Sequence, residues 1–316
     1  MPWVALAFSL ALCLAFAATY YPFRRTFGCG KSTRNPDPLC YMHDEKGTKD
    51  YEGHKRSIET VLAAPFESVF ITSKDGLRLA AKYYEGDPGA PVVIFFHGYR
   101  SNAIHDGCGL YCIARELGYH VLMCDQRSHG ESLGRALSFG VLEREDARLW
   151  AEYAAKRFAD APIFLSGISM GAATVLMAAS LPLPKTVVGI LADCPYSSPR
   201  DIITKVLADM KLPARLVYPL VRLGARLYGG FDPDAADAVS SVAQKTPPIL
   251  IVHGLADGFV PAEMSMCIDA AASGEHRLVL VEGADHGKSY TVAPELYVSV
   301  FKEFCAACLD ARQETK

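Results

Sequence analysis

The sequence predicts an α/β protein with a mainly parallel central sheet and helices on both faces of that sheet. Half of the 316 residues are hydrophobic, which is enough for a sizeable core. From residue 92 onward, apolar strand-like runs alternate with helical patterns, as in sheets built from strand–helix–strand units. The run 92–96 is apolar throughout, which is typical of a strand buried on both faces.

The elements follow one another in a regular order. The first two strands are expected at 66–73 and 77–84, joined by the turn signal Lys74-Asp75-Gly76, and form an antiparallel start to the sheet. The remaining strands are expected at 92–96, 120–124, 163–165, 187–191, 249–252 and 277–281. Helices are expected at 51–63, 108–117, 142–158, 172–180 and 292–309.

One stretch interrupts this rhythm. About 50 residues separate Asp193 from Pro248, where a single helix would suffice. Two helices are expected here, at 201–210 and 215–228, forming a small helical cap over about residues 197–245. The segment 211–223 mixes bulky apolar residues with cations. It lines an acyl pocket, faces a membrane surface or packs on the body, and the sequence leaves these alternatives open.

The motif with the clearest chemistry is Gly167-Ile168-Ser169-Met170-Gly171, a G-x-S-x-G sequence between an apolar strand and a small-residue helix. Glycines at both ends allow a tight turn that exposes the Ser169 hydroxyl above the sheet. The following helix directs its first N–H groups to the same place, where they stabilise an oxyanion. The motif therefore predicts a nucleophilic serine.

A serine hydroxyl is a poor nucleophile at neutral pH and requires a base and an orienting acid. His286 follows the strand at 277–281, and Asp257 follows the strand at 249–252. His286 is expected to take the Ser169 proton, and Asp257 is expected to hold the imidazole. Asp193, at the end of the strand 187–191, is a rival for the acid, but the pattern His-Gly-x-x-Asp-x-x-Val-Pro favours Asp257.

Several pieces of the chain resemble the α/β-hydrolases of the serine esterase and aminopeptidase-like (S33) type, and most of all membrane-anchored bacterial members with a short N-terminal helix. The pieces are His97-Gly98-Tyr99 and the segments 125–132, 167–171, 253–261 and 284–287. The resemblance implies the α/β-hydrolase fold over about residues 61–316. It also implies an oxyanion hole made by the N–H groups of Tyr99 and Met170. Under the same resemblance His97, Arg127 and His129 are expected to brace loops.

The function that follows is serine hydrolysis of a carboxylic ester, a thioester or an amide through an acyl-enzyme, most simply as a carboxylesterase. This chemistry requires no cofactor and no metal. The substrate is expected to be a small molecule or an acyl or peptidyl group, and the net charge of −3 does not suggest nucleic acid. The alternatives are an acyltransferase or peptidase with the same triad, and a non-catalytic, membrane-tethered binding protein with this fold.

The N-terminus carries a separate signal. Residues 1–23 contain no charged side chain, and about 20 apolar residues suffice to cross a bilayer. We favour a retained transmembrane anchor, followed by a polar connector at 24–60, with the cations after it placing the body in the cytoplasm. The alternative is a signal peptide cleaved at Ala15-Phe16-Ala17, which would make the protein secreted, although it lacks the usual basic start.

The ten cysteines favour a reducing compartment. Cys124 lies in an apolar strand pattern, and Cys267, Cys305 and Cys308 lie in helical patterns, which is typical of buried free thiols. Cys29 and Cys40 flank a polar segment and would be able to pair if the protein were exported. The Cys305-Ala306-Ala307-Cys308 sequence lies on a terminal helix, which does not suit a redox or zinc site.

Overall fold

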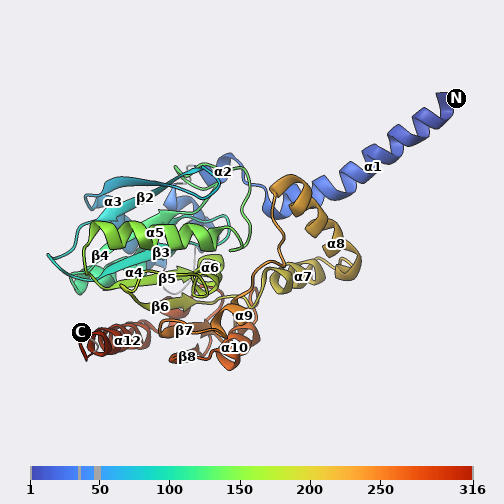
Figure 1. The fold of residues 1–316 in the computed structure, drawn as a ribbon. Helices are drawn as coiled ribbons and strands as arrows, with labels where there is room; N and C mark the ends of the chain where they lie inside the picture. The colour runs from blue at the N-terminus through green and yellow to red at the C-terminus, as the bar shows by residue number, and fades with distance from the viewer. Residues whose placement is uncertain (1, 35–36, 46–50, 315–316) are drawn as a thin grey trace.

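A computed structural model describes residues 2–34, 37–45 and 51–314 of the chain (Figure 1). Within them, an eight-stranded sheet has the order β1-β2-β4-β3-β5-β6-β7-β8. The strands are β1 (Glu67–Thr72), β2 (Arg78–Tyr84), β3 (Val92–Phe96), β4 (His120–Asp125), β5 (Ile163–Ile168), β6 (Val187–Asp193), β7 (Ile249–Gly254) and β8 (His276–Val281). Only the pairs β1–β2 and β2–β4 are antiparallel, so the predicted mainly parallel sheet with an antiparallel start is confirmed.

The register of the parallel strands brings the predicted polar residues to one edge. Asp193, the last residue of β6, pairs with Ile168 at the end of β5 and with Val252 in β7. The loops that follow β5, β6 and β7 therefore begin at the same edge of the sheet. Catalytic groups in open α/β sheets belong at this carboxyl edge.

Helices cover both faces of the sheet, as predicted (Figure 1). One apolar core lies under α5 (Glu143–Arg157), α6 (Met170–Ala178), α9 (Ala238–Val242) and α10 (Ala262–Ala271). The other lies under α3 (Tyr51–Ala63), α4 (Ala103–Glu116) and α12 (Pro294–Glu314). Three short helices complete the body: α2 (Lys31–Arg34), the 3₁₀ helix η1 (Pro38–Glu45) and α11 (Ser289–Val292). The all-buried β3 lies between the two cores, which explains its uninterrupted apolar sequence.

The insertion after β6 forms a small helical cap. It contains α7 (Pro199–Asp209), α8 (Ala214–Gly224) and the π-helical turn η2 (Ala225–Gly229). Ser198 caps α7 by accepting a hydrogen bond from the N–H of Asp201. The second predicted helix, 215–228, is shorter than expected, because its last residues form a π-turn that Gly230 closes with a positive φ of 71°.

The N-terminal helix α1 (Pro2–Phe27) continues past residue 23, where the sequence predicts its end. Phe23 and Phe27, one helical turn apart, are buried in a third core with Tyr218 and Val221 of α8. The Thr19 Oγ1 lies 2.9 Å from the hydroxyl of Tyr228. The second half of α1 is thus a packing element of the cap, while its first half extends away from the body (Figure 1).

The predicted transmembrane helix at residues 1–23 finds no support. Among the described residues, no helix has both the length and the apolar character that crossing a membrane requires. The compartment of the body remains a prediction.

The predicted connector at 24–60 is largely docked on the body. Gly28 forms a β-bridge with Ala136, and the Gly130 N–H donates to the Thr33 carbonyl over 2.8 Å. Residues 35–36 and 46–50 of this segment lie outside the described residues. The rest differs from a polar linker because Phe27 and Met42 supply apolar side chains that the body buries.

Candidate active site

The backbone at Ser169 is a strained turn between β5 and α6. Its φ of 54° lies in the left-handed region that non-glycine residues rarely adopt. A Cβ on Gly167 would lie 2.3 Å from the Gly171 carbonyl carbon, and a Cβ on Gly171 would lie 1.9 Å from the Phe96 oxygen. Only glycine fits at either position, so both glycines of the motif are required by packing. The Ser169 N–H donates to the Asp193 carbonyl over 2.8 Å, which fixes the turn to β6.

The structure brings the three predicted catalytic residues together. The Ser169 Oγ lies 2.9 Å from the His286 Nε2, and the His286 Nδ1 lies 2.7 Å from the Asp257 Oδ2. Each residue comes from a different loop at the carboxyl edge, after β5, β8 and β7 respectively. This geometry allows a proton to pass from the serine hydroxyl to the imidazole, with the carboxylate fixing the imidazole tautomer.

The Asp257 carboxylate is surrounded by hydrogen-bond partners. Its Oδ1 accepts the N–H groups of Phe259 (2.9 Å) and Val260 (2.7 Å), and its Oδ2 contacts the His253 Nε2 at 3.2 Å as well as His286. Burial alone would raise the pKa of this carboxyl, but the hydrogen bonds from His253 and His286 hold the pKa well below its usual value. The Asp257 carboxylate therefore stays charged beside the imidazole.

Asp193, the rival acid, occupies a different environment at the end of β6. Its side chain is buried, and within the described part of the chain its Oδ1 has no hydrogen-bond partner. Burial raises the pKa of Asp193 to about 6. Of the two carboxyls, Asp257 is the one in hydrogen-bond contact with the His286 Nδ1.

His253 is a residue whose role the sequence reasoning missed. It is fully buried, its Nδ1 lies 2.6 Å from the Ser265 hydroxyl, and its Nε2 lies 2.9 Å from the Val260 carbonyl. These contacts aim the ring at Asp257. The signal was present in the sequence, because His253 and Asp257 are four residues apart across the turn that follows β7.

The loop after β3, which carries the predicted oxyanion-hole residue Tyr99, lies beside Ser169. A Cβ on Gly98 would lie 3.5 Å from the Ser169 Cβ. The Gly98 N–H donates to the Asp106 carboxylate over 2.7 Å, and the Tyr99 hydroxyl donates to the Thr26 carbonyl over 2.9 Å. Hydrogen bonds therefore fix both the backbone just before Tyr99 and the Tyr99 side chain. Met170 is the first residue of α6, so its N–H has no acceptor within the helix.

The other polar residues of the recognised segments occupy bracing positions. The His97 Nε2 accepts the Gln126 N–H over 3.1 Å, which ties the loop after β3 to the loop after β4. Arg127 forms a two-pronged contact with Asp146 at 2.7 and 2.8 Å. Burial lowers the pKa of His129 to about 3, so this histidine is neutral.

A cavity of about 330 Å³ opens at the triad. Ser169, His286, Gly98 and Tyr99 lie in its wall, and Asp193 and Tyr297 line it as well. Much of the remaining wall comes from α3, α4, the loop after β7 and the segment after His286, and includes His54, Ser57, His105, Cys108, Phe259, Tyr290 and Thr291. The mixture of aromatic and polar groups suits a small organic substrate with a few polar atoms.

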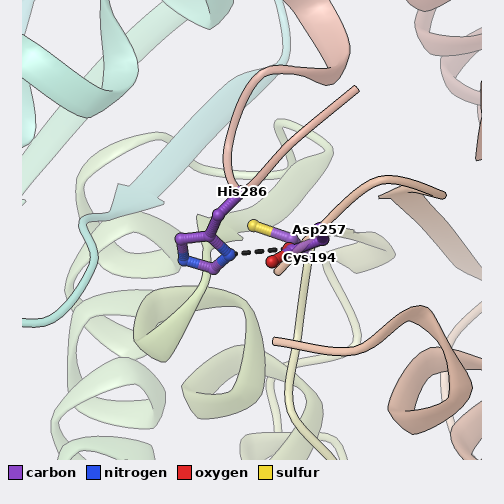
Figure 2. A group of neighbouring side chains, drawn as sticks. All are labelled: Cys194, Asp257 and His286. Carbon is purple, nitrogen blue, oxygen red and sulfur yellow. Dashed lines mark hydrogen bonds and ion pairs between the residues drawn. The ribbon is translucent and has the colours of Figure 1, made fainter. Parts of the chain in front are cut away.

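One group of potential metal ligands exists among the described residues, and it overlaps the triad. Figure 2 shows Cys194 beside Asp257 and His286, with one ligand atom of each within 4.8 Å of the others. Burial raises the pKa of the Cys194 thiol well above its usual value, so the sulfur is protonated, whereas a metal requires the thiolate. The imidazole and the carboxylate are already bonded to each other. The donor set therefore fits an acid–base pair better than a metal centre.

A mostly parallel eight-stranded sheet, with a serine on a tight strand–turn–helix connection after β5, defines this chain as a protein of α/β-hydrolase fold. Residues 88–227 match the sequence family described as serine aminopeptidase, S33.

Two relatives illustrate the similarity in sequence. The chain is 25% identical over 215 residues to the uncharacterized protein YqkD of Bacillus subtilis, covering 67% of this chain and 70% of that protein. It is 26% identical over 200 residues to the human protein ABHD12B, covering 60% and 52% of the two chains.

Solved structures share the fold. The esterase Pf2001 of Pyrococcus furiosus superposes with a TM-score of 0.63 at 23% identity, over 79% of this chain and 93% of the esterase. Est1E of Butyrivibrio proteoclasticus, solved with ferulic acid bound, superposes with a TM-score of 0.58 at 20% identity, over 77% and 99%. At these identities the likeness concerns the fold alone.

Proposed function

We propose that the protein is a serine hydrolase that cleaves a carboxylic ester, thioester or amide through an acyl-enzyme. The observation that carries this proposal is the continuous line of contacts from Ser169 to His286 to Asp257, at 2.9 and 2.7 Å, in the wall of a cavity. Such a line activates a hydroxyl that is otherwise a weak nucleophile.

The first half of the reaction forms the acyl-enzyme. The Ser169 Oγ attacks the substrate carbonyl carbon while the His286 Nε2 accepts the hydroxyl proton. The N–H groups of Tyr99 and Met170 stabilise the oxyanion of the tetrahedral intermediate. The bond to the leaving group breaks, and His286 returns its proton to that group. Ser169 then carries the acyl group as an ester.

The second half uses the same residues with water. His286 removes a proton from a water molecule, and the resulting hydroxide attacks the acyl carbon. The bond from carbon to the Ser169 Oγ breaks, and His286 returns the proton to the serine. Asp257, held ionised by its hydrogen bonds, stabilises the imidazolium in both halves.

Among the possible substrates we favour small carboxylic esters. Two of the structural neighbours are named as esterases or carry a bound aromatic acid, while the matching family is described as a serine aminopeptidase. The cavity of about 330 Å³ suits a compact acyl group. Amide hydrolysis, thioester hydrolysis and acyl transfer use the same triad, so the experiment below must distinguish among them.

The test has two arms. A fluorophosphonate probe is expected to label the protein at Ser169, and the label is expected to vanish in Ser169→Ala. Ser166→Ala is the matched control, because Ser166 is a buried serine on β5, the strand that ends just before Ser169, and lines the same cavity. An unlabelled protein would favour the non-catalytic binding protein.

The second arm measures turnover. Hydrolysis of p-nitrophenyl esters of increasing chain length is compared with hydrolysis of aminoacyl p-nitroanilides. We expect the short esters to be cleaved fastest. Faster cleavage of the aminoacyl amides would assign the protein to the peptidases.

A further inference from the structure

The cap helix α8 is apolar on two opposite faces. Its inner face carries Tyr218 and Val221, which are buried against α1 and the body. Its outer face and the following turn carry four leucines in the open: Leu216 (71% exposed), Leu220 (36%), Leu223 (44%) and Leu227 (60%). Steps of four, three and four residues place these side chains on one line along the helix. We call this line the leucine stripe.

Cations run along one side of the leucine stripe. Arg215 is exposed in the first turn of α8, and Lys211 is exposed in the turn that precedes the helix. Arg222 and Arg226 continue the row, and both contact Asp232, which neutralises part of their charge. Lys211 and Arg215 therefore present the positive charge that an outside partner would meet. A leucine face bordered by cations is the pattern of a helix that lies in a membrane interface.

The helix α1 carries a second exposed apolar face. It leaves the body beside α8 (Figure 1) and exposes Leu10 (59%), Leu14 (62%) and Tyr21 (67%). Arg24 and Arg25 follow at its C-terminal end and are also exposed. The three apolar side chains lie on the side of α1 opposite Thr19 and Phe23, which pack on the cap, so they do not continue the leucine stripe. The leucine stripe by itself is an exposed apolar face, and such faces mark interaction sites.

We propose that the leucine stripe, with Lys211 and Arg215, docks on the surface of an anionic lipid bilayer. The leucines enter the boundary of the acyl chains, and the two cations lie among the headgroup phosphates. A bilayer supplies both requirements at once, because its apolar interior begins directly below a layer of negative charge. The helix then lies in the plane of the interface and holds the cap, and with it the catalytic edge of the sheet, toward the lipid.

A tryptophan placed in the stripe tests this proposal in the full-length protein. The background is Trp3→Phe, which leaves Trp150 buried in the core as the remaining native tryptophan. Leu216→Trp reports on the stripe, and Leu296→Trp, at a leucine of α12 that is 43% exposed, is the matched control. The probe is vesicles of equal parts phosphatidylcholine and phosphatidylglycerol with brominated acyl chains.

We expect the Leu216→Trp emission to shift to the blue and to be quenched severalfold more than that of Leu296→Trp. A vesicle-bound protein whose Leu216→Trp emission is not quenched would overturn the proposal, because α1 alone would then make the contact. Absence of binding to the vesicles would overturn it as well. A blue shift without lipid, together with a doubled mass in sedimentation, would assign the stripe to a second copy of the chain.

The cations are tested separately. Lys211→Ser and Arg215→Ser are each expected to lower partitioning onto the anionic vesicles about fivefold and to have little effect on pure phosphatidylcholine. Lys185→Ser and Lys245→Ser, at exposed lysines outside α1 and α8, are the matched controls and should leave partitioning unchanged. Equal effects of the two pairs would show that the basic edge of α8 has no specific part in docking.

Discussion

The carboxyl ends of β6 and β7 place the same functional group at the same edge of the sheet, in opposite physical states. Asp257, after β7, is held by two backbone N–H groups and two imidazoles, and its pKa is depressed. Asp193, at the end of β6, is buried with an unpartnered oxygen among the described residues, and its pKa is raised to about 6. Both carboxyls lie at the same edge of the sheet, so their hydrogen-bond partners and burial, rather than their position, set the difference between their pKa values.

The largest expected effect tests whether either carboxyl serves a reaction at all. Ser169→Ala should fold normally and lose about 10³- to 10⁶-fold in kcat, since it removes the nucleophile and little volume. His286→Ala should cost a similar factor, because the triad acts as a unit. Steady-state ester hydrolysis gives the measurement. If Ser169→Ala kept wild-type turnover, the proposed reaction would be wrong, and neither Asp193 nor Asp257 would have a part in it.

The next effect concerns the two carboxyls directly. Asp257→Asn should lower kcat by about 10⁴-fold, because an amide at this position favours the wrong imidazole tautomer. Asp193→Asn should change kcat by less than about tenfold, since the His286 Nδ1 contacts Asp257. Both variants are compared at matched thermal stability. The reverse ranking would transfer the orienting role to Asp193.

A smaller effect is expected from His253, which orients Asp257 without reaching the cavity wall at the nucleophile. His253→Ala should lower kcat about 10- to 100-fold through misplacement of the carboxylate. His253→Gln, which keeps a donor, should recover part of the loss, while KM stays nearly constant in both variants. A KM effect without a kcat effect would contradict a positioning role.

The smallest effect is on stability and has opposite signs at the two carboxyls. Asp193 holds its proton to about pH 6 in the fold but only to about pH 4 when unfolded. Its contribution to the free energy of unfolding therefore falls by on the order of 2 kcal/mol as the pH rises from about 4 to about 6. Asp193→Asn should remove this loss and raise the Tm by several degrees at pH 7.5 but not at pH 4.

Asp257 provides the comparison for that experiment. Its depressed pKa contributes stability above about pH 4, and this contribution disappears as the pH falls through the folded-state pKa. Asp257→Asn should therefore lower the Tm at pH 7.5. Calorimetry at both pH values checks the two signs. A Tm that falls in both variants at pH 7.5 would show that Asp193 is stabilised by partners rather than strained by burial.

Local patterns were sufficient to predict the sheet and the meeting of Ser169, Asp257 and His286. Each strand is a short apolar run, and each of these residues follows such a run at the carboxyl edge. The glycines of the serine motif could also be predicted, because the backbone approach that requires them is common to the motif.

What could not be predicted depends on contacts between distant segments. The burial of Phe23 and Phe27 requires Tyr218 and Val221, almost two hundred residues away, so α1 appeared as an isolated apolar segment. The role of His253 depends on Ser265, which only the fold brings to its ring. The difference between Asp193 and Asp257 follows from which N–H groups surround each carboxyl, and a single sequence does not reveal this.

The packing of α1 on the cap sets the N-terminal boundary of the folded unit. A Cβ on Gly224 would lie 2.5 Å from the Thr19 carbonyl, so the two helices touch through their backbones at this point. A chain shortened to begin at residue 28 would leave the inner face of α8 open to water and should be less stable than one that begins at Ala18. Signal-peptidase cleavage after Ala17 would spare Thr19, Phe23 and Phe27. A processed and an unprocessed N-terminus would therefore leave the same cap in place.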